Sequence, residues 1–178
     1  MARLLVTSHR DGKSSIGLDQ SIPAVPFKSV PGFDTALVWG TAAAPSVPWD
    51  GRNAADGRES VLPDVGETRL MRVTFPPDSS VMPADFDPAA AGAEYTSRIP
   101  GLAQRFEPDS PGMHTTDSVD YGILIEGEIS LELDDGKTVA LKPGDVVVQN
   151  GTRHAWRNPG TKPATLIFVL IGARRKEG

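Results

Sequence analysis

Two histidines and an aspartate are the residues of this chain whose spacing is best suited to chemistry. His114, Thr116 and Asp120 are separated by even numbers of residues, so they share one face where the chain is extended. His154 begins a second extended stretch that ends at Asn158. If both stretches point inward, two imidazoles and one carboxylate converge. Such a donor set suits Fe(II), Mn(II), Ni(II) or Zn(II) and leaves positions open for a substrate. We therefore take His114, Asp120 and His154 as candidate metal ligands and catalytic residues.

The same residues also allow a site without a metal. His114 could be a pocket histidine hydrogen-bonded to Thr116 or Asp120. A histidine that binds no metal could act as an acid or a base near neutral pH. Thr116 is a poor metal ligand, but it could hold a water molecule beside the site.

Three further residues are candidates for the surrounding pocket. Trp156 could stack on a planar ligand or belong to the core, and the sequence leaves these alternatives open. Tyr121 is interpreted as a wall residue rather than a phenolic proton donor. Gln149 could hydrogen-bond a ligand from the end of a strand, although its position favours exposure in a loop.

Short strands joined by tight turns must position these side chains. Apolar and polar residues alternate over residues 129–134, which is the pattern of a half-buried strand. Asp135-Gly136 is a strong hairpin signal, and a Pro-Gly turn at residues 142–145 leads to an apolar strand at residues 146–148. We expect a meander of antiparallel strands with a histidine at each end.

This segment, about the last 70 residues, resembles the cupin superfamily. In the first cupin motif, His114 matches the first histidine and Gly127 the closing glycine. Thr116 stands where the motif has its second histidine, and Asp120 stands where it has its glutamate. Pro108 occupies the position of the opening glycine.

The second cupin motif is matched by the segment around the other histidine. Gly151, His154 and Asn158 fit it in register, with Gln149 at the position of its proline. The Pro-Gly-Asp turn at residues 143–145 is typical of cupins, although its glycine is one residue closer than the motif has it.

The resemblance implies an all-β fold, a cupin jelly-roll β-barrel with an N-terminal extended arm and a short helical segment before the first motif. We expect the arm and extra strands over residues 1–66, the barrel over residues 67–172 and a flexible basic tail over residues 173–178. Cupin metal sites normally use three histidines and a glutamate. This chain has one ligand fewer and a shorter carboxylate, which implies weaker metal binding or none.

Two segments outside the motifs carry expectations of their own. Asp87-Pro88 is a helix-start signal within residues 86–106, which we expect to form either a lid across the barrel rim or a connector on its outside. Residues 166–171 are apolar without interruption, so both faces of a strand over residues 164–172 should be buried. We expect the N-terminal arm or a second subunit to cover the outer face, which predicts a homodimer.

Composition limits the remaining classes of function. The 178 residues suit one domain, and the net charge of −5 comes without a basic patch, so a nucleic-acid partner is not expected. The longest apolar run is too short to cross a bilayer. The sequence contains no cysteine and its start does not have the pattern of a signal peptide, so we expect a cytoplasmic protein.

Three functions follow from the resemblance. The first is a small-molecule enzyme acting on an oxygen-rich or carboxylate-bearing metabolite, of the decarboxylase, dioxygenase, lyase or isomerase type. The second is a ligand-binding cupin without catalysis. A storage role ranks last, because seed-storage cupins are paired barrels and only one pair of motifs is present. Fold alone does not choose among them.

Overall fold

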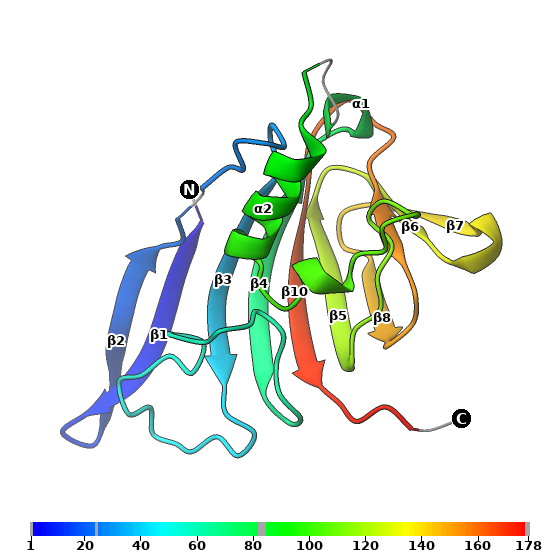
Figure 1. The fold of residues 1–178 in the computed structure, drawn as a ribbon. Helices are drawn as coiled ribbons and strands as arrows, with labels where there is room; N and C mark the ends of the chain where they lie inside the picture. Colours follow the sequence, from blue (N-terminus) through cyan, green and yellow to red (C-terminus); the bar gives the residue numbers. More distant parts are fainter. Residues whose placement is uncertain (1, 24, 82–84, 177–178) are drawn as a thin grey trace.

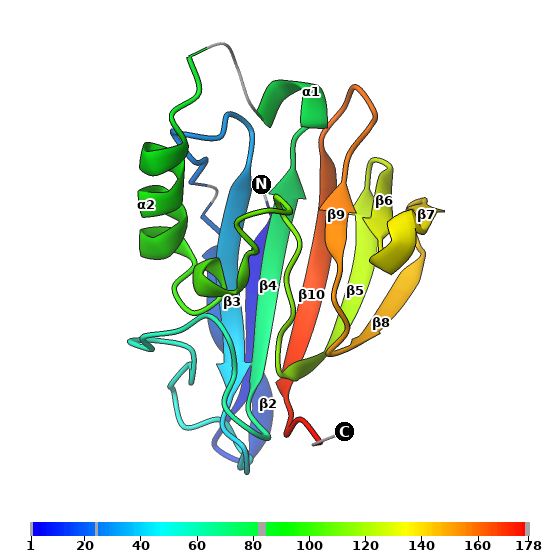
Figure 2. The same ribbon diagram turned by 45° about the vertical axis from the view of Figure 1, so that its right-hand side comes forward.

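The computed structural model describes residues 2–23, 25–81 and 85–176, and its described part is built from three antiparallel sheets (Figure 1). A five-stranded sheet has the order β3-β4-β10-β5-β8, a three-stranded sheet has the order β7-β6-β9, and β1 pairs with β2. The three-stranded sheet lies over the β5 and β8 side of the five-stranded sheet (Figure 2). The predicted all-β jelly roll is confirmed.

The strands have the following bounds: β1 Arg3–Arg10, β2 Lys13–Ser21, β3 Asp34–Thr41, β4 Thr68–Phe75, β5 Ser118–Glu126, β6 Ile129–Glu132, β7 Thr138–Leu141, β8 Val146–Asn150, β9 Ala155–Arg157 and β10 Ala164–Gly172. The short helical elements are α1 Asp78–Val81, α2 Pro88–Arg98, η1 Ala103–Arg105 and η2 Asp134–Gly136.

The expected meander around the histidines is wrong in its pairing. β8 does not pair with β7, which precedes it, but with β5 in the other sheet. The turn before β8 makes this crossing: Gly144 has a φ of 97°, and its N–H donates to the carbonyl of Leu124 on β5 at 2.8 Å. The chain then returns to the three-stranded sheet at β9, which pairs with β6. These crossings place the two histidine segments side by side.

The expected N-terminal arm begins as a β-hairpin. Asp11 and Gly12 form its turn with φ values of 52° and 74°, a left-handed pair that an Asp-Gly sequence favours. β1 and β2 form a sheet of their own, and Leu5 and Ile16 on them are 49% and 59% exposed. β3, by contrast, is the edge strand of the five-stranded sheet beside β4.

Helix α2 starts where the sequence predicts, because Asp87 caps it. The Asp87 carboxylate accepts hydrogen bonds from the N–H groups of Ala89 and Ala90 at 2.9 and 3.1 Å. The helix covers the concave face of the sheet over β3 and β4 (Figure 1), and the segment that follows it buries Ile99 in the core. Residues 86–106 therefore pack on the inner face of the sheet rather than outside the barrel.

The core has two clusters on this inner face. The larger joins Met71, Val73 and Leu170 of the sheet to Phe27 and Ile99, and the smaller lies between the two sheets and contains Leu124, Ile129 and Leu166. No helix among the described residues is long and apolar enough to span a membrane.

Candidate functional site

The two candidate histidines are neighbours in the structure. His114 precedes β5 and His154 precedes β9, and the backbone N–H of each donates to the carbonyl of the other at 3.0 Å. Their ring centroids are 4.3 Å apart. The side chains are 9% and 3% exposed, so the pair lies inside the molecule. Residues forty positions apart in the sequence thus form one imidazole pair.

Backbone carbonyls fix the orientation of both imidazoles. His114 Nδ1 lies 3.0 Å from the carbonyl of Gly112, and His154 Nδ1 lies 2.9 Å from that of Thr152. A carbonyl oxygen can only accept a hydrogen bond, so Nδ1 of each ring must carry the proton. In the neutral ring, Nε2 then has a free lone pair.

Burial keeps these rings neutral. It lowers the pKa of His114 below its ordinary value. Burial together with repulsion from His114 lowers the pKa of His154 to about 4. Near neutral pH the pair therefore offers two unprotonated Nε2 atoms, which can accept a proton or bind a cation.

Asp120 lies on the inward face of β5, at even spacing from Thr116 and Ser118. Ser118 Oγ donates to Thr116 Oγ1 at 2.9 Å, and Thr116 Oγ1 donates to Asp120 Oδ2 at 3.5 Å. All three residues are buried. Burial raises the pKa of Asp120, and these hydroxyl groups only partly offset it. The environment thus favours the protonated acid, while it favours the neutral base at the histidines.

Gln149 lies beside Asp120 on the neighbouring strand. The two residues are register partners on β8 and β5, and Gln149 is 5% exposed. Its Oε1 accepts a hydrogen bond from Thr152 at 2.5 Å, which leaves its amide nitrogen for another partner. The sequence favoured exposure for this side chain, and that expectation is wrong because the pairing of β8 with β5 turns it inward.

Two other pocket candidates have different outcomes. Tyr121 does not line the interior: it is 42% exposed, on the opposite face of β5 from Asp120. Trp156 packs inside the barrel, with its ring centroid 5.4 Å from that of Phe168 and 6.0 Å from that of His154. It belongs to the core beside the site.

An aromatic side chain that the sequence did not single out closes the other side of the site. Phe106 follows η1, and its ring meets the His114 ring edge to face with centroids 5.2 Å apart. The only sequence signal for it is its place at the end of the segment that leads into the first motif.

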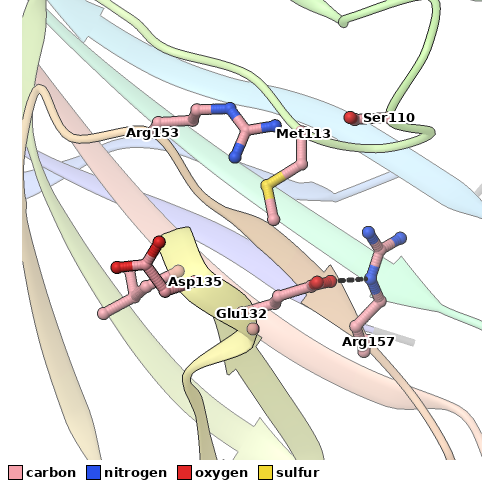
Figure 3. A pocket seen from close by; sticks show the side chains of 8 residues that line it. Ser110, Met113, Glu132, Asp135, Arg153 and Arg157 are labelled. Atoms are coloured by element: carbon pink, nitrogen blue, oxygen red, sulfur yellow. Dashed lines mark hydrogen bonds and ion pairs between the residues drawn. The ribbon is translucent and has the colours of Figure 1, made fainter.

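A cavity of about 330 Å³ is lined by residues that precede His114, by the end of β6 and η2, and by two arginines of the second motif. Arg153, Arg157, Glu132 and Met113 are among its lining residues, and Arg157 donates to Glu132 at 2.5 Å (Figure 3). Neither imidazole lines it. Its arginines are already paired with carboxylates, so we do not place the chemistry there.

The donor set fits the metal that the resemblance implies only in part. The two Nε2 atoms have the free lone pairs and carbonyl-anchored Nδ1 groups of metal-binding histidines. However, no group of three His, Cys, Asp or Glu side chains in the described part of the chain is close enough to hold a metal ion. Asp120 therefore does not complete the predicted three-ligand set, and we derive no catalytic step through a metal.

Comparison with known proteins identifies the segment that carries the site. Residues 103–170 match the family model described as "Cupin domain". The chain is 49% identical over 63 residues to phomopsin biosynthesis cluster protein C' of Diaporthe leptostromiformis, which is 35% of this chain and 33% of that protein. It is 43% identical over 65 residues to the cupin-domain-containing oxidoreductase virC of Hypocrea virens, which is 35% of this chain and 34% of that protein. The chain thus spans about a third of the length of these curated relatives.

Among solved structures, the fold is similar to that of a Cupin 2 conserved barrel domain protein from Salinispora arenicola. The TM-score is 0.41 and the sequence identity is 15%, and the match covers 86% of this chain and 92% of that one.

Proposed function

This chain belongs to the cupin superfamily, with its cupin domain at residues 103–170, and from this premise we propose that it is an enzyme acting on a small oxygen-rich or carboxylate-bearing metabolite. The observation that supports catalysis is that burial displaces the pKa values of the histidine pair and of the inward-facing Asp120 from their ordinary values. Burial favours the neutral form of His114 and His154 and the protonated form of Asp120. Buried titratable groups whose pKa values are displaced from their ordinary values are candidates for acid–base chemistry.

The proposed reaction is a proton transfer next to a carbonyl group. Nε2 of His114 or His154 removes a proton from the carbon adjacent to the carbonyl, while protonated Asp120 gives its proton to the carbonyl oxygen. The product is an enol, and the enzyme now carries one imidazolium and one carboxylate. In a substrate with a carbon–carbon double bond next to the deprotonated carbon, this enol is a dienol: the imidazolium gives its proton to the far end of that double bond, and Asp120 takes back the enol proton. The carbonyl is re-formed, the double bond has moved into conjugation with it, and the enzyme is restored.

Gln149 has the position to orient the substrate in this reaction. Gln149 and Asp120 are register partners on neighbouring strands, and both side chains point to the inward face of the sheet. A carbonyl oxygen placed between them would accept from both, so charge that develops on it would be stabilised by two donors.

The names of the relatives support a role in biosynthesis. One relative is named for a biosynthesis cluster, and another is named an oxidoreductase. We propose that the substrate here is likewise an intermediate of a biosynthetic pathway. An oxidoreductase reaction is a second candidate on the strength of that name, with Fe, Mn, Ni or Zn as the cofactor and the His114 and His154 Nε2 atoms as two of its ligands.

We also propose that the protein forms a homodimer. The outer face of the five-stranded sheet presents Tyr121, Val146 and Val148, which are 42%, 61% and 52% exposed. Contiguous exposed apolar side chains of this kind mark protein–protein contact sites.

The test compares His114→Ala and His154→Ala with His9→Ala, which alters the exposed third histidine. Each protein is incubated with a metabolite extract from the source organism, and mass spectrometry records which compounds change. We expect the wild type and His9→Ala to convert the same compound, and the two pocket variants to lose at least 100-fold in rate. Their melting temperatures should stay within a few degrees of the wild type.

The competing functions give different results in the same preparations. Retention of a compound without conversion, lost in both pocket variants, would replace the enzyme by the ligand-binding alternative. Metal analysis is done on protein purified without chelator or nickel resin. Near-stoichiometric metal that disappears in His154→Ala would favour the metal-dependent oxidoreductase over the metal-free isomerase.

A further inference from the structure

Three buried polar atoms in the described residues have no hydrogen-bond partner, and their residues lie on a single row of the five-stranded sheet. They are Arg69 Nε, Asp120 Oδ1 and Gln149 Nε2. Arg69 on β4 pairs with Leu170 on β10, Leu170 with Asp120 on β5, and Asp120 with Gln149 on β8. Register partners point to the same face of a sheet, so the three side chains all point inward.

Arg69 is the member of this row that the proposed reaction does not use. It is 1% exposed, and it is the largest fully buried side chain of the described part of the chain. Its Nη1 donates to the carbonyl of Thr68 at 2.8 Å and its Nη2 to Glu67 at 2.6 Å. A buried guanidinium N–H that makes no hydrogen bond costs free energy of folding. The unpartnered Nε–H of Arg69 therefore points to a ligand that supplies the acceptor.

The charges around Arg69 do not cancel. Arg58 Nη2 donates to the second oxygen of Glu67 at 2.7 Å, so one carboxylate serves two guanidinium groups. Burial would raise the pKa of Glu67, but hydrogen bonds and the charges of both arginines hold it below its ordinary value. Glu67 is therefore ionised near neutral pH, and the group of three retains one positive charge.

A cavity of about 370 Å³ gives a ligand access to this group. Arg58, Arg69, Ser60 and Leu62 line it. Glu59 and Asp64 also line it; like Arg58 they are exposed, so solvent screens the charges of these three residues more than that of the buried Arg69. The cavity volume is sufficient for a small anion, and Arg69, whose Nε has no partner, is one of the lining residues.

We propose that Arg58 and Arg69 form a subsite for the carboxylate of the substrate. The guanidinium of Arg69 presents its Nε–H, and a carboxylate is the acceptor that matches a guanidinium edge. Adjacent strands are about 4.8 Å apart, so the backbones of Arg69 and Asp120 are about 10 Å apart across β10. The substrate would therefore carry its carboxylate several bonds away from the oxygen that reacts at Asp120 and Gln149. This inference rests on the proposed function.

The direct test uses the Nε–H resonance of Arg69 in ¹⁵N-labelled protein, with sodium acetate as the probe. The Arg69→Lys variant identifies the resonance by its loss. If that variant does not fold, Arg58→Gln takes its place. It leaves Arg69 intact and removes only the arginine that shares Glu67 with it, so the resonance that moves is that of Arg69. We expect acetate to shift this resonance saturably, and sodium chloride at equal ionic strength to shift it far less. Arg58→Gln should weaken acetate binding at least threefold.

Arg72 provides the matched control, because it lies on the opposite face of the same strand and is paired with Asp34 at 3.1 Å. Its Nε–H resonance should not respond to acetate. An unchanged Arg69 resonance, or equal responses to acetate and chloride, would overturn the carboxylate subsite. The measurement needs no turnover, so acetate binding in an inactive protein would leave the subsite standing while the proposed reaction fails.

Discussion

Burial, rather than residue type, distinguishes the histidine pair from the remaining histidine. His114 and His154 are enclosed and hold their protons on Nδ1 toward backbone carbonyls, whereas His9 is exposed on β1. An ionised His154 would lose hydration, and it would be repelled by His114 when that ring is also protonated. At the scale of single residues, the site is therefore a base held in its unprotonated form.

Because His154 is held neutral in the folded protein, the free energy of unfolding should fall as the pH is lowered. The pKa of His154 is about 4 in the folded protein and 6.5 as the ordinary value, so the unfolded chain binds more protons between these pH values. The free energy of unfolding should thus decrease as the pH falls from about 6.5 to about 4. The loss attributable to His154 should be on the order of 3 kcal/mol. Urea unfolding at several pH values measures it.

Two variants make this attribution specific. His154→Gln removes the titrating group and should flatten the decrease between pH 6.5 and 4, whereas His9→Gln should follow the wild type. Asp120 contributes with the opposite sign, because its pKa is raised and its cost to stability appears as the pH rises through the folded value. An equally steep decrease in His154→Gln would show that other groups are responsible.

At the scale of elements, one capped helix controls how the site is enclosed. The segment from α2 to η1 packs Ala91, Tyr95 and Ile99 onto the inner face of the sheet and ends at Phe106, whose ring contacts His114. Glu94 ties the helix to the preceding chain by accepting from the N–H groups of Lys28 and Ser29. Access to the imidazoles therefore depends on this segment.

Loss of the helix cap should loosen this cover without altering the site itself. Asp87→Ala leaves two N–H groups of the first turn without their acceptor, so the free energy of unfolding should decrease by about 1 kcal/mol. Amide hydrogen exchange over residues 88–98 should accelerate more than exchange over β4. Asp85→Ala, an exposed aspartate two residues earlier, is the matched control. Equal effects of both variants would rule out the cap as the cause.

At the scale of the whole molecule, two surfaces of the described residues expose apolar side chains. One is the β1–β2 hairpin, which forms a sheet of its own, and a two-stranded sheet alone is marginally stable in water. The other is the outer face of the main sheet, where Tyr121 stands between Val148 and Val169 in register. Both are explained if a second copy covers them.

If the protein is a homodimer, one charged substitution on the outer face of the sheet should dissociate it. Val148→Glu places a carboxylate on the edge strand β8, beside Tyr121 on the outer face, and should shift the mass measured by light scattering from dimer to monomer at micromolar concentration. Val47→Glu, at a loop position that is 94% exposed, should remain dimeric. A wild-type protein that is monomeric under these conditions would contradict the proposal.

Local patterns in the sequence were sufficient for the strands and for part of the site. The bounds of β10 agree with the predicted residues 164–172, and Asp87-Pro88 marks the start of α2, because strand patterning and capping depend on neighbouring residues. Even spacing predicted that Thr116 and Asp120 share one face, and their hydroxyl and carboxylate groups are in contact. Tyr121 directly follows Asp120, so strand alternation alone places it on the opposite face, which is the outward orientation that the structure shows.

Only the tertiary structure decided which faces meet. β4 has an arginine on each face, Arg69 and Arg72, so its own pattern could not tell which one is buried. The pairing of β10 between β4 and β5, and of β8 with β5, placed Arg69, Asp120 and Gln149 on one inward row. Strand pairing joins residues that are distant in the sequence and is set by the packing of the whole barrel, so no local pattern encodes it. The sequence thus determined the strands and the histidine pair's chemistry, and the packed sheets determined what that chemistry faces.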